Sequence, residues 1–549
     1  MDPYQEDIIL NELSKEISCL TNYGKSTKGL GYEMFQKMQQ HKDKTAQFIA
    51  KSGTSDTYEE LLKRSIRTAL HLKARNLKRT DVVTLCTYNH ENSCVPFIAT
   101  QFLGLKVASL DPSFTVGEAS YLLDMVKPKI VFVVAEAVET IAESLEKAEL
   151  QAEVVVFGEE IDNSTFTSFA SFLEECPDED IFEPEVVDAT ETAVIYFSSG
   201  TTGLPKGICV SHKSLYHNAF TFHYSAFIVS NEVILSYSSP FWVSAAMLLT
   251  CAIVTGSARV ICQKFDPEQI WIILEKYKVT YVFLAAIQGY GMICSTRPEG
   301  LDTSCFRTVT TGGSPFPQEQ LFTLRNMLPG TFVFQCYGCT EVAGPLTLFN
   351  LNRVNDRILL NQQPNSCGRP VPGFTYKVVN VDTGEACGVN EKGELRIKSE
   401  FCLNGYYNQD STSAFDEEGW LRTGDVVYFD KDFCYYVVGR IKEMLKYRSW
   451  HVQPALLEGI LQQHPAVKQC IVVGIPHPVD GDHPVGVVVV HEDHLEDVTA
   501  EEIQDFVAKR VNDTHKLRGG VRFIDKLPLI PSGKIKRLLV QDMVVQGLV

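Results

Sequence analysis

Short apolar runs alternate with longer helix-length segments through the first 200 residues. The runs 82–85, Ile130–Val134 and Glu153–Phe157 are short enough to be buried strands, and Tyr58–Ala74 and 138–150 are long enough to be helices. Strands that alternate with helices are typical of parallel sheets covered by helices on both faces. The pattern therefore predicts an α/β fold with doubly wound sheets.

The texture changes near residue 366, where closely spaced Gly and Asp turns begin to separate short β segments. These segments predict a β-rich lobe, and they cover residues 375–380, 393–397 and 434–438. A compact tail then alternates helix and strand again, over residues 454–463, 467–474, 485–491 and 500–511. We expect a large N-terminal domain over residues 1–439, a hinge at 440–442 and a small α+β C-terminal domain over 443–549.

One uncharged stretch of 26 residues lies between Glu232 and Arg259 and is long enough to cross a membrane. Pro240 and Gly256 interrupt it, and seven Ser or Thr residues dilute it. The stretch therefore favours a buried strand and helix of a large core, and we expect no transmembrane segment.

The charge balance limits the partners that the chain can have. A length of 549 residues predicts two or more domains. A formal net charge of −18 disfavours nucleic acid or an anionic membrane as the main partner, because both attract a basic face.

The N-terminus lacks the pattern of a signal peptide, so we expect the sixteen cysteines to be reduced intracellular thiols. A CxxC pair at Cys336 and Cys339 has no second pair with ligand spacing, so it does not predict a metal site.

A glycine-rich loop follows the predicted strand 192–197. Its sequence is Ser198-Ser199-Gly200-Thr201-Thr202-Gly203-Leu204-Pro205-Lys206-Gly207. Glycines let the backbone fold closely around an anion, hydroxyl and N–H groups donate to phosphate oxygens, and Lys206 supplies a positive charge. The loop fits neither GxxxxGK[ST] nor GxGxxG, so its composition alone is also compatible with a surface turn.

The string SSGTTGLPKG closely resembles the signature of the adenylate-forming superfamily, which contains acyl- and aryl-CoA ligases, beetle luciferases and peptide-synthetase adenylation domains. The other motifs of that superfamily follow in order, as TGGSP at 311–315, YGCTE at 337–341, GRP at 368–370, GWLRTGD at 419–425, GRIKE at 439–443 and PSGK at 531–534. The tail KLRGGV at 516–521 and the length are most similar to insect luciferase-like fatty acyl-CoA synthetases.

This resemblance implies ATP-dependent activation of a carboxylic acid to acyl-AMP with release of pyrophosphate, then transfer to CoA. The expected cofactors are ATP, Mg²⁺ and the cosubstrate CoA. Lys534 would bridge the carboxylate and the α-phosphate, Thr340 would donate to the α-phosphate, and Glu341 would hold Mg²⁺. Tyr337 would stack on adenine and Asp425 would bind the ribose hydroxyls.

The remaining ATP-binding residues implied by the resemblance are Ser198, Ser199, Gly200, Thr201, Thr202, Gly203, Lys206, Gly313, Ser314, Gly338 and Arg440. Family members rotate a mobile small domain between the two half-reactions. Here Lys442 would occupy the hinge, and Lys446 would complete the site for thioester formation.

The chain departs from the luciferase pattern beside the expected acid pocket. Trp242 and Val243 stand where beetle luciferases carry paired histidines, and Asn218 replaces an arginine of the luciferin site. Ser449 and Trp450 replace a glycine–aromatic pair that shapes the CoA channel. The changes at Trp242, Val243 and Asn218 weaken a luciferin-oxygenating activity and leave adenylation intact. The change at Ser449 weakens the expectation of CoA transfer instead.

The expected pocket residues are small or apolar, namely Trp242, Val243, Ala285, Ala286, Gly312 and Gly344. They favour a medium- or long-chain fatty acid, since burial of each methylene contributes about 0.8 kcal/mol. A luciferin monooxygenase, an aryl-acid CoA ligase of the 4-coumarate type and a non-catalytic nucleotide-binding protein remain alternatives. The C-terminus is not Ser-Lys-Leu, so we expect a cytoplasmic protein or import into peroxisomes by another route.

Overall fold

A computed structural model describes residues 8–19, 25–158, 165–198, 205–225, 228, 231–448, 450–495, 497–529 and 535–549, without the side chains of Ser198, Trp450 and His451. The chain forms two compact units. The large unit holds residues 1–377, 396–422 and 432–435, and the small unit holds 378–395, 423–431 and 436–549. The expected hinge at 440–442 falls within the small unit and stays a prediction.

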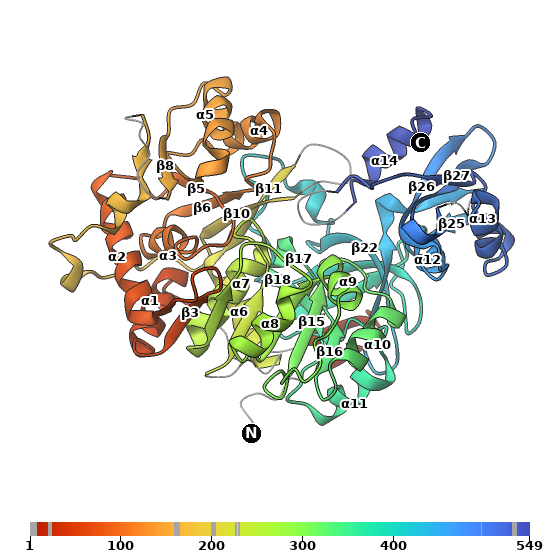
Figure 1. The fold of residues 1–549 in the computed structure, drawn as a ribbon, viewed down its shortest axis with the longest axis horizontal. Coiled ribbons are helices and arrows are strands. Elements are labelled where there is room, and N and C mark those ends of the chain that lie inside the picture. The colour runs from red at the N-terminus through yellow and green to blue at the C-terminus, as the bar shows by residue number, and fades with distance from the viewer. Residues whose placement is uncertain are drawn as a thin grey trace. The chain divides into compact units, whose positions relative to one another are not determined.

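Among the described residues of the large unit, one seven-stranded sheet has the order β11-β10-β6-β5-β7-β8-β9 (Figure 1). Its strands run parallel except for the antiparallel pair β10–β11. The strands are β5 (Val82–Cys86), β6 (Lys106–Leu110), β7 (Ile130–Val134), β8 (Glu153–Phe157), β9 (Thr167–Ser168), β10 (Thr192–Ser198) and β11 (Lys206–Ser211). The helices among them are α2 (Tyr58–Ala74), α3 (Val95–Phe102), α4 (Val116–Val126) and α5 (Val138–Lys147). The apolar runs predicted as strands are confirmed.

A second seven-stranded sheet of the described chain has the order β16-β15-β14-β12-β13-β3-β4, and it is parallel except for β3–β4. Its strands are β3 (Thr45–Ile49), β4 (Ser55–Thr57), β12 (Val233–Ser236), β13 (Ala258–Ile261), β14 (Tyr281–Ala285), β15 (Thr308–Gly312) and β16 (Phe332–Gln335). The helices of this region are α1 (Leu30–Gln40), α6 (His212–Ser225), α7 (Val243–Thr255), α8 (Gln269–Lys276), α9 (Ala286–Cys294), α10 (Gln318–Met327) and α11 (Val354–Gln362).

The uncharged stretch between Glu232 and Arg259 forms β12, α7 and the start of β13, as expected. Every residue of α7 from Ala246 to Thr255 is buried, which explains why the stretch carries no charge. None of the helices in the described part of the chain combines the length and the hydropathy that a membrane crossing requires.

The predicted β segments after residue 366 are present as short strands. They correspond to β20 (Phe374–Val379), β21 (Gly393–Lys398) and β23 (Tyr435–Arg440). Two further strands, β19 (Arg369–Pro370) and β22 (Leu421–Phe429), were not predicted. β19 joins a small antiparallel sheet with β17 (Tyr337–Cys339) and β18 (Gly344–Leu348). The N-terminal hairpin of β1 (Ile8–Asn11) and β2 (Glu16–Cys19) pairs with β20.

The tail is built around a long hairpin of β26 (Val467–His477) and β27 (Gly481–Val490). Its side chains alternate between two apolar clusters, because successive residues of a strand point to opposite faces. Val472 and Val488 belong to one cluster, with residues of α12 (Pro454–Leu461) and α13 (Ala500–Ala508). Ile471 and Val487 belong to the other, with α14 (Arg537–Val545). The strands β24 (Leu445–Tyr447), β25 (Trp450–Val452) and β28 (Val521–Phe523) complete the sheet.

The architecture confirms the predicted fold class. A large α/β domain of doubly wound sheets and a β-rich lobe precede a small α+β C-terminal domain.

Candidate active site

The carboxyl ends of three parallel strands bring several predicted site residues to one edge of the second sheet. β14 ends at Ala285, which pairs with Gly312 at the end of β15. β16 pairs with β15 on its other side, where Thr311 lies opposite Gln335. The Cys336 N–H, just after β16, donates to the Thr311 carbonyl at 2.9 Å. Ligands of open parallel sheets bind outside this edge. The edge is therefore the candidate active site of the large unit.

The loop after β15 leaves its backbone open. Gly312 is buried, with its Cα facing Cys336 and Phe283, whereas Gly313 and Ser314 are exposed. Gly313 has φ +83°, and no atom lies within 4 Å of where its Cβ would stand. Glycine adopts this left-handed conformation without strain, and the missing side chain lets a flat ligand approach the main chain.

The segment that follows β16 holds Tyr337, Gly338, Thr340 and Glu341. Tyr337 and Gly338 form β17, and a Cβ on Gly338 would lie 2.2 Å from the Gly344 carbonyl oxygen on β18. Only glycine permits this approach of the two strands. Thr340 and Glu341 follow in a half-buried 3₁₀ turn, and the Leu403 N–H donates to the Glu341 carbonyl at 2.7 Å.

Lys206 meets a tyrosine that no sequence motif indicated. It begins β11, and its Nζ lies 4.3 Å from the ring centroid of Tyr406. Burial, together with the nearby Glu341 carboxylate, raises the pKa of the Tyr406 hydroxyl. A cation, a phenol and a carboxylate thus gather near one another. Tyr406 lies about 200 residues after Lys206 in the chain, and the two meet because the segment around Tyr406 pairs with β11 through a bridge to Ile208 and neighbouring backbone hydrogen bonds. No local pattern could therefore have indicated the tyrosine.

The small unit holds a paired carboxylate and guanidinium of its own. Asp425 on β22 has 4% of its surface exposed, and its Oδ1 lies 2.9 Å from Arg440 Nε at the end of β23. The Asp425 N–H donates to Thr423 Oγ1 of the same strand at 3.1 Å. The two residues predicted for the ribose end of the nucleotide are therefore in direct contact.

The remaining predicted residues of the nucleotide site and the tail divide into two groups. Lys442, in the 3₁₀ turn Ile441–Glu443, and Lys446 on β24 are both exposed. Several others lie outside the described residues, namely Ser199, Gly200, Thr201, Thr202, Gly203 and Lys534, as does the side chain of Ser198.

The predicted acid pocket draws on several elements of the large unit. Trp242 and Val243 begin α7 after β12, and Ala285 and Ala286 join β14 to α9. A Cβ on Gly344 would lie 3.0 Å from Met247 Sδ of α7 and 3.1 Å from Asn218 Cβ of α6, so this face is tightly packed.

Asn218 is fully buried rather than directed into open space. Its amide donates to the carbonyl oxygens of Val342 and Ser214, the latter at 3.3 Å. An arginine at this position would place a guanidinium much further from the helix. The asparagine side chain therefore holds the connection between β17 and β18 by its hydrogen bond to the Val342 carbonyl.

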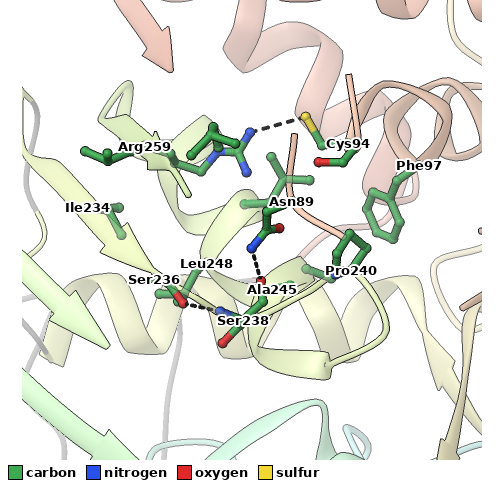
Figure 2. A pocket seen from close by; sticks show the side chains of 15 residues that line it. Asn89, Cys94, Phe97, Ile234, Ser236, Ser238, Pro240, Ala245, Leu248 and Arg259 are labelled. Carbon is green, nitrogen blue, oxygen red and sulfur yellow. Dashed lines mark hydrogen bonds between the residues drawn. The ribbon is translucent and has the colours of Figure 1, made fainter. Parts of the chain in front are cut away.

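A separate cavity of about 50 Å³ lies between α3, α7, β12 and β13 (Figure 2). Arg259 lines it and donates from Nη2 to Cys94 Sγ at 3.2 Å, while Asn89 Nδ2 donates to the Ser238 carbonyl at 3.0 Å. Pro240 and Ala245 belong to its lining, but none of the six predicted pocket residues does.

Comparison with known proteins identifies the family. The model of the AMP-binding enzymes matches residues 34–407, and the model of the AMP-binding enzyme C-terminal domain matches 456–534. The chain belongs to the AMP-binding enzyme family. It is an adenylate-forming enzyme that resembles acyl- and aryl-CoA ligases, which confirms the resemblance drawn from the motifs.

Individual relatives cover most of this AMP-binding enzyme. Luciferin 4-monooxygenase of Photinus pyralis is 30% identical over 89% of each chain, and 4-coumarate--CoA ligase of Pinus taeda is 32% identical over 87% of each. The solved luciferase-like enzyme of the nonluminescent mealworm Zophobas morio is 37% identical with a TM-score of 0.73, over 77% of this chain and 98% of that one. ATP-bound MatB of Rhodopseudomonas palustris, 22% identical, shares the fold with a TM-score of 0.83 over 94% of this chain and 99% of that one.

Proposed function

We propose that this enzyme activates a medium- or long-chain fatty acid with ATP to an acyl-AMP, releases pyrophosphate and transfers the acyl group to CoA. The observation that carries the proposal is the meeting of Gly312, Gly313 and the Tyr337–Glu341 segment at the carboxyl edge of the second sheet. Matches to both family models, and relatives named as CoA ligases, support ATP and CoA as its ligands.

The nucleotide roles follow from the charges that the reaction must neutralise. A carboxylate attacks the α-phosphate of ATP, so cations and donors must stabilise the developing negative charge. We assign this to Lys534 and Thr340, with Lys206 and the loop 198–203 on the outer phosphates. Tyr337 would stack on adenine, while Asp425 would accept from the ribose hydroxyls with Arg440 beside it.

Glu341 is the residue that would hold Mg²⁺. A carboxylate oxygen is the ligand type that this hard cation prefers, and Glu341 stands half-buried near Tyr406 and at the edge that carries Tyr337. The bound ion would neutralise phosphate charge. The cation–π contact with Tyr406, rather than the metal, would hold the Lys206 side chain in place.

The acid pocket favours an alkyl chain over luciferin. Its predicted residues are apolar or small, and Asn218 is committed to main-chain carbonyls. No histidine stands at Trp242 or Val243. For the second half-reaction, Lys442 would act as the hinge, and Lys446 would complete the thioester-forming site.

A panel of acids in the ATP–pyrophosphate exchange assay tests this function. We expect exchange with fatty acids of medium and long chain, and CoA-dependent formation of the matching thioesters. Exchange limited to coumarate-like acids would instead assign an aryl-acid ligase, and light with luciferin and MgATP would assign a monooxygenase. Binding of ATP without exchange for any acid would refute adenylation.

A further inference from the structure

Two histidines and one aspartate gather at the turn between β26 and β27 in the small unit. His477 ends β26 opposite Gly481, and His483 on β27 pairs with Ile475. Because side chains alternate along strands, the two histidines lie on the same face of the hairpin. Their rings stack with centroids 4.1 Å apart and an interplanar angle of 12°.

Asp480 in the turn completes a compact set of ligand atoms. Its Oδ2 lies 2.9 Å from His483 Nε2 and 3.5 Å from His477 Nδ1. The three atoms lie within 4.8 Å of one another, and this is the one such group of three or more His, Cys, Asp or Glu among the described residues. A metal ion bound at about 2.0–2.2 Å from each ligand needs this spacing.

We infer that His477, Asp480 and His483 bind a divalent transition metal of the Zn²⁺ type, with water in the remaining position. Two imidazole nitrogens and one carboxylate oxygen suit Zn²⁺, Co²⁺, Ni²⁺ or Cu²⁺, whereas Mg²⁺ and Ca²⁺ prefer all-oxygen sites. The site is thus chemically distinct from Glu341, the proposed Mg²⁺ ligand. In the metal-free turn, His477 Nδ1 accepts a long bond from the Asp480 N–H at 3.2 Å, which the metal would replace.

The second oxygen of Asp480 is used in a way that is compatible with metal binding. Arg448 Nε donates to Oδ1 at 2.6 Å, and the Arg448 N–H donates to the Asp480 carbonyl at 2.7 Å. Oδ2 therefore faces the imidazoles while Oδ1 stays fixed by the guanidinium. Carboxylate ligands in metal sites are commonly oriented by such an outer hydrogen bond.

The turn also anchors the strand that carries Lys446. The Lys446 N–H donates to Asp482 Oδ2 at 2.9 Å, and a Cβ on Gly481 would lie 2.3 Å from the Lys446 carbonyl oxygen. A metal bound by both histidines and Asp480 would therefore rigidify the turn against which β24 packs. Metal binding to the folded protein alone should raise its unfolding temperature.

Titration of the full-length, tag-free protein with Zn²⁺ in millimolar Mg²⁺ tests the site. We expect one tight equivalent by calorimetry, and a loss of affinity of at least about tenfold in each of His477→Gln and His483→Gln. His494→Gln removes a partly exposed histidine of the same unit and should bind as the wild type does. Equal Zn²⁺ affinity in the wild type and both ligand variants would overturn the inference.

A Co²⁺ spectrum of the wild type provides a test that depends on no variant. Intense visible bands of four- or five-coordinate Co²⁺ would support the site, and only the weak bands of octahedral Co²⁺ would count against it. The two glutamine variants should retain the wild-type circular dichroism, because both rings are partly exposed.

Discussion

The buried Asp425 carboxylate pairs with the solvent-facing Arg440 guanidinium, and its proposed role in binding the ribose of ATP can be tested by substitution. The Arg440 side chain is 46% exposed, whereas that of Asp425 is 6% exposed. Asp425→Ala should raise the KM for ATP about 10- to 100-fold, because charge-assisted hydrogen bonds contribute about 1.5–3 kcal/mol. Pyrophosphate exchange against ATP concentration measures the change.

Asp430→Asn is the matched control for Asp425→Ala. Asp430 follows the same strand and accepts from the Tyr436 hydroxyl at 2.9 Å. We expect its KM for ATP to stay near the wild-type value. An equal rise in both variants would show that Asp425 only supports the strand, and would remove it from the nucleotide site.

His212 should make the stability of the large unit depend on pH. The Leu30 N–H donates to its Nδ1 at 3.3 Å, and burial lowers the pKa of the ring to about 4 from its ordinary value of 6.5. Between those values the unfolded chain takes up a proton that the folded chain does not. Stability is therefore complete above pH 6.5 and is lost as the pH falls toward 4, by about 2 kcal/mol at pH 5.

Urea unfolding at pH 7 and pH 5 measures this effect. His212→Gln should lose less stability over the interval than the wild type does. The partly buried His90, whose pKa desolvation also lowers to about 4, keeps part of the pH dependence of stability in that variant. An identical slope in both proteins would contradict the assignment to His212.

Single site residues could be predicted from the sequence where a motif carried them, and not where the fold alone brings them together. The motif at 419–425 and the one at 439–443 indicated Asp425 and Arg440, which the structure joins at 2.9 Å. Tyr406 belongs to no motif, and it reaches Lys206 only because the chain after residue 403 pairs beside β11.

Secondary-structure elements were predicted best where the sequence marks their ends. The helix Tyr58–Ala74 matches α2, because Thr57 and Glu60 form a capping box at its start. The predicted strand 485–491 is too short, since β27 begins at Gly481. Asp482 and Pro484 are typical of turns, but long-range pairing with β26 holds them in the sheet.

The β17–β18 connection should tolerate no side chain at Gly338. A methyl group there would lie 2.2 Å from the Gly344 carbonyl oxygen, so the strands must separate and displace the adjoining Tyr337–Glu341 segment. We expect Gly338→Ala to lower stability by about 1–3 kcal/mol and to reduce pyrophosphate exchange. Thermal unfolding and the exchange rate measure both effects.

Gly459→Ala is the opposite case and serves as the control. Gly459 lies within α12, and nothing stands within 4 Å of where its Cβ would be. Alanine there should stabilise the helix by about 0.5–1 kcal/mol and leave exchange unchanged. If Gly338→Ala were as stable as this control, the tight approach of β17 to β18 would not exist in solution.

At the scale of the whole molecule, the lysines of the tail should separate the two half-reactions. Lys534 and Lys446 both belong to the C-terminal domain predicted over residues 443–549, yet the family resemblance gives them different steps. Lys534→Ala should abolish pyrophosphate exchange, because it removes an interaction made mainly in the transition state of adenylation. Lys446→Ala should keep exchange and slow thioester formation from preformed acyl-AMP.

Lys468→Ala controls for the loss of an exposed positive charge from the same sheet. Both half-reactions should proceed normally in it. If a domain movement lets one site serve two steps, each lysine is needed in only one arrangement of the domains. Lys534→Ala should then lose adenylation alone, and Lys446→Ala should lose thioester formation alone. If Lys446→Ala and Lys534→Ala slowed both steps equally, a single fixed arrangement would explain the kinetics, and the hinge at Lys442 would have no role.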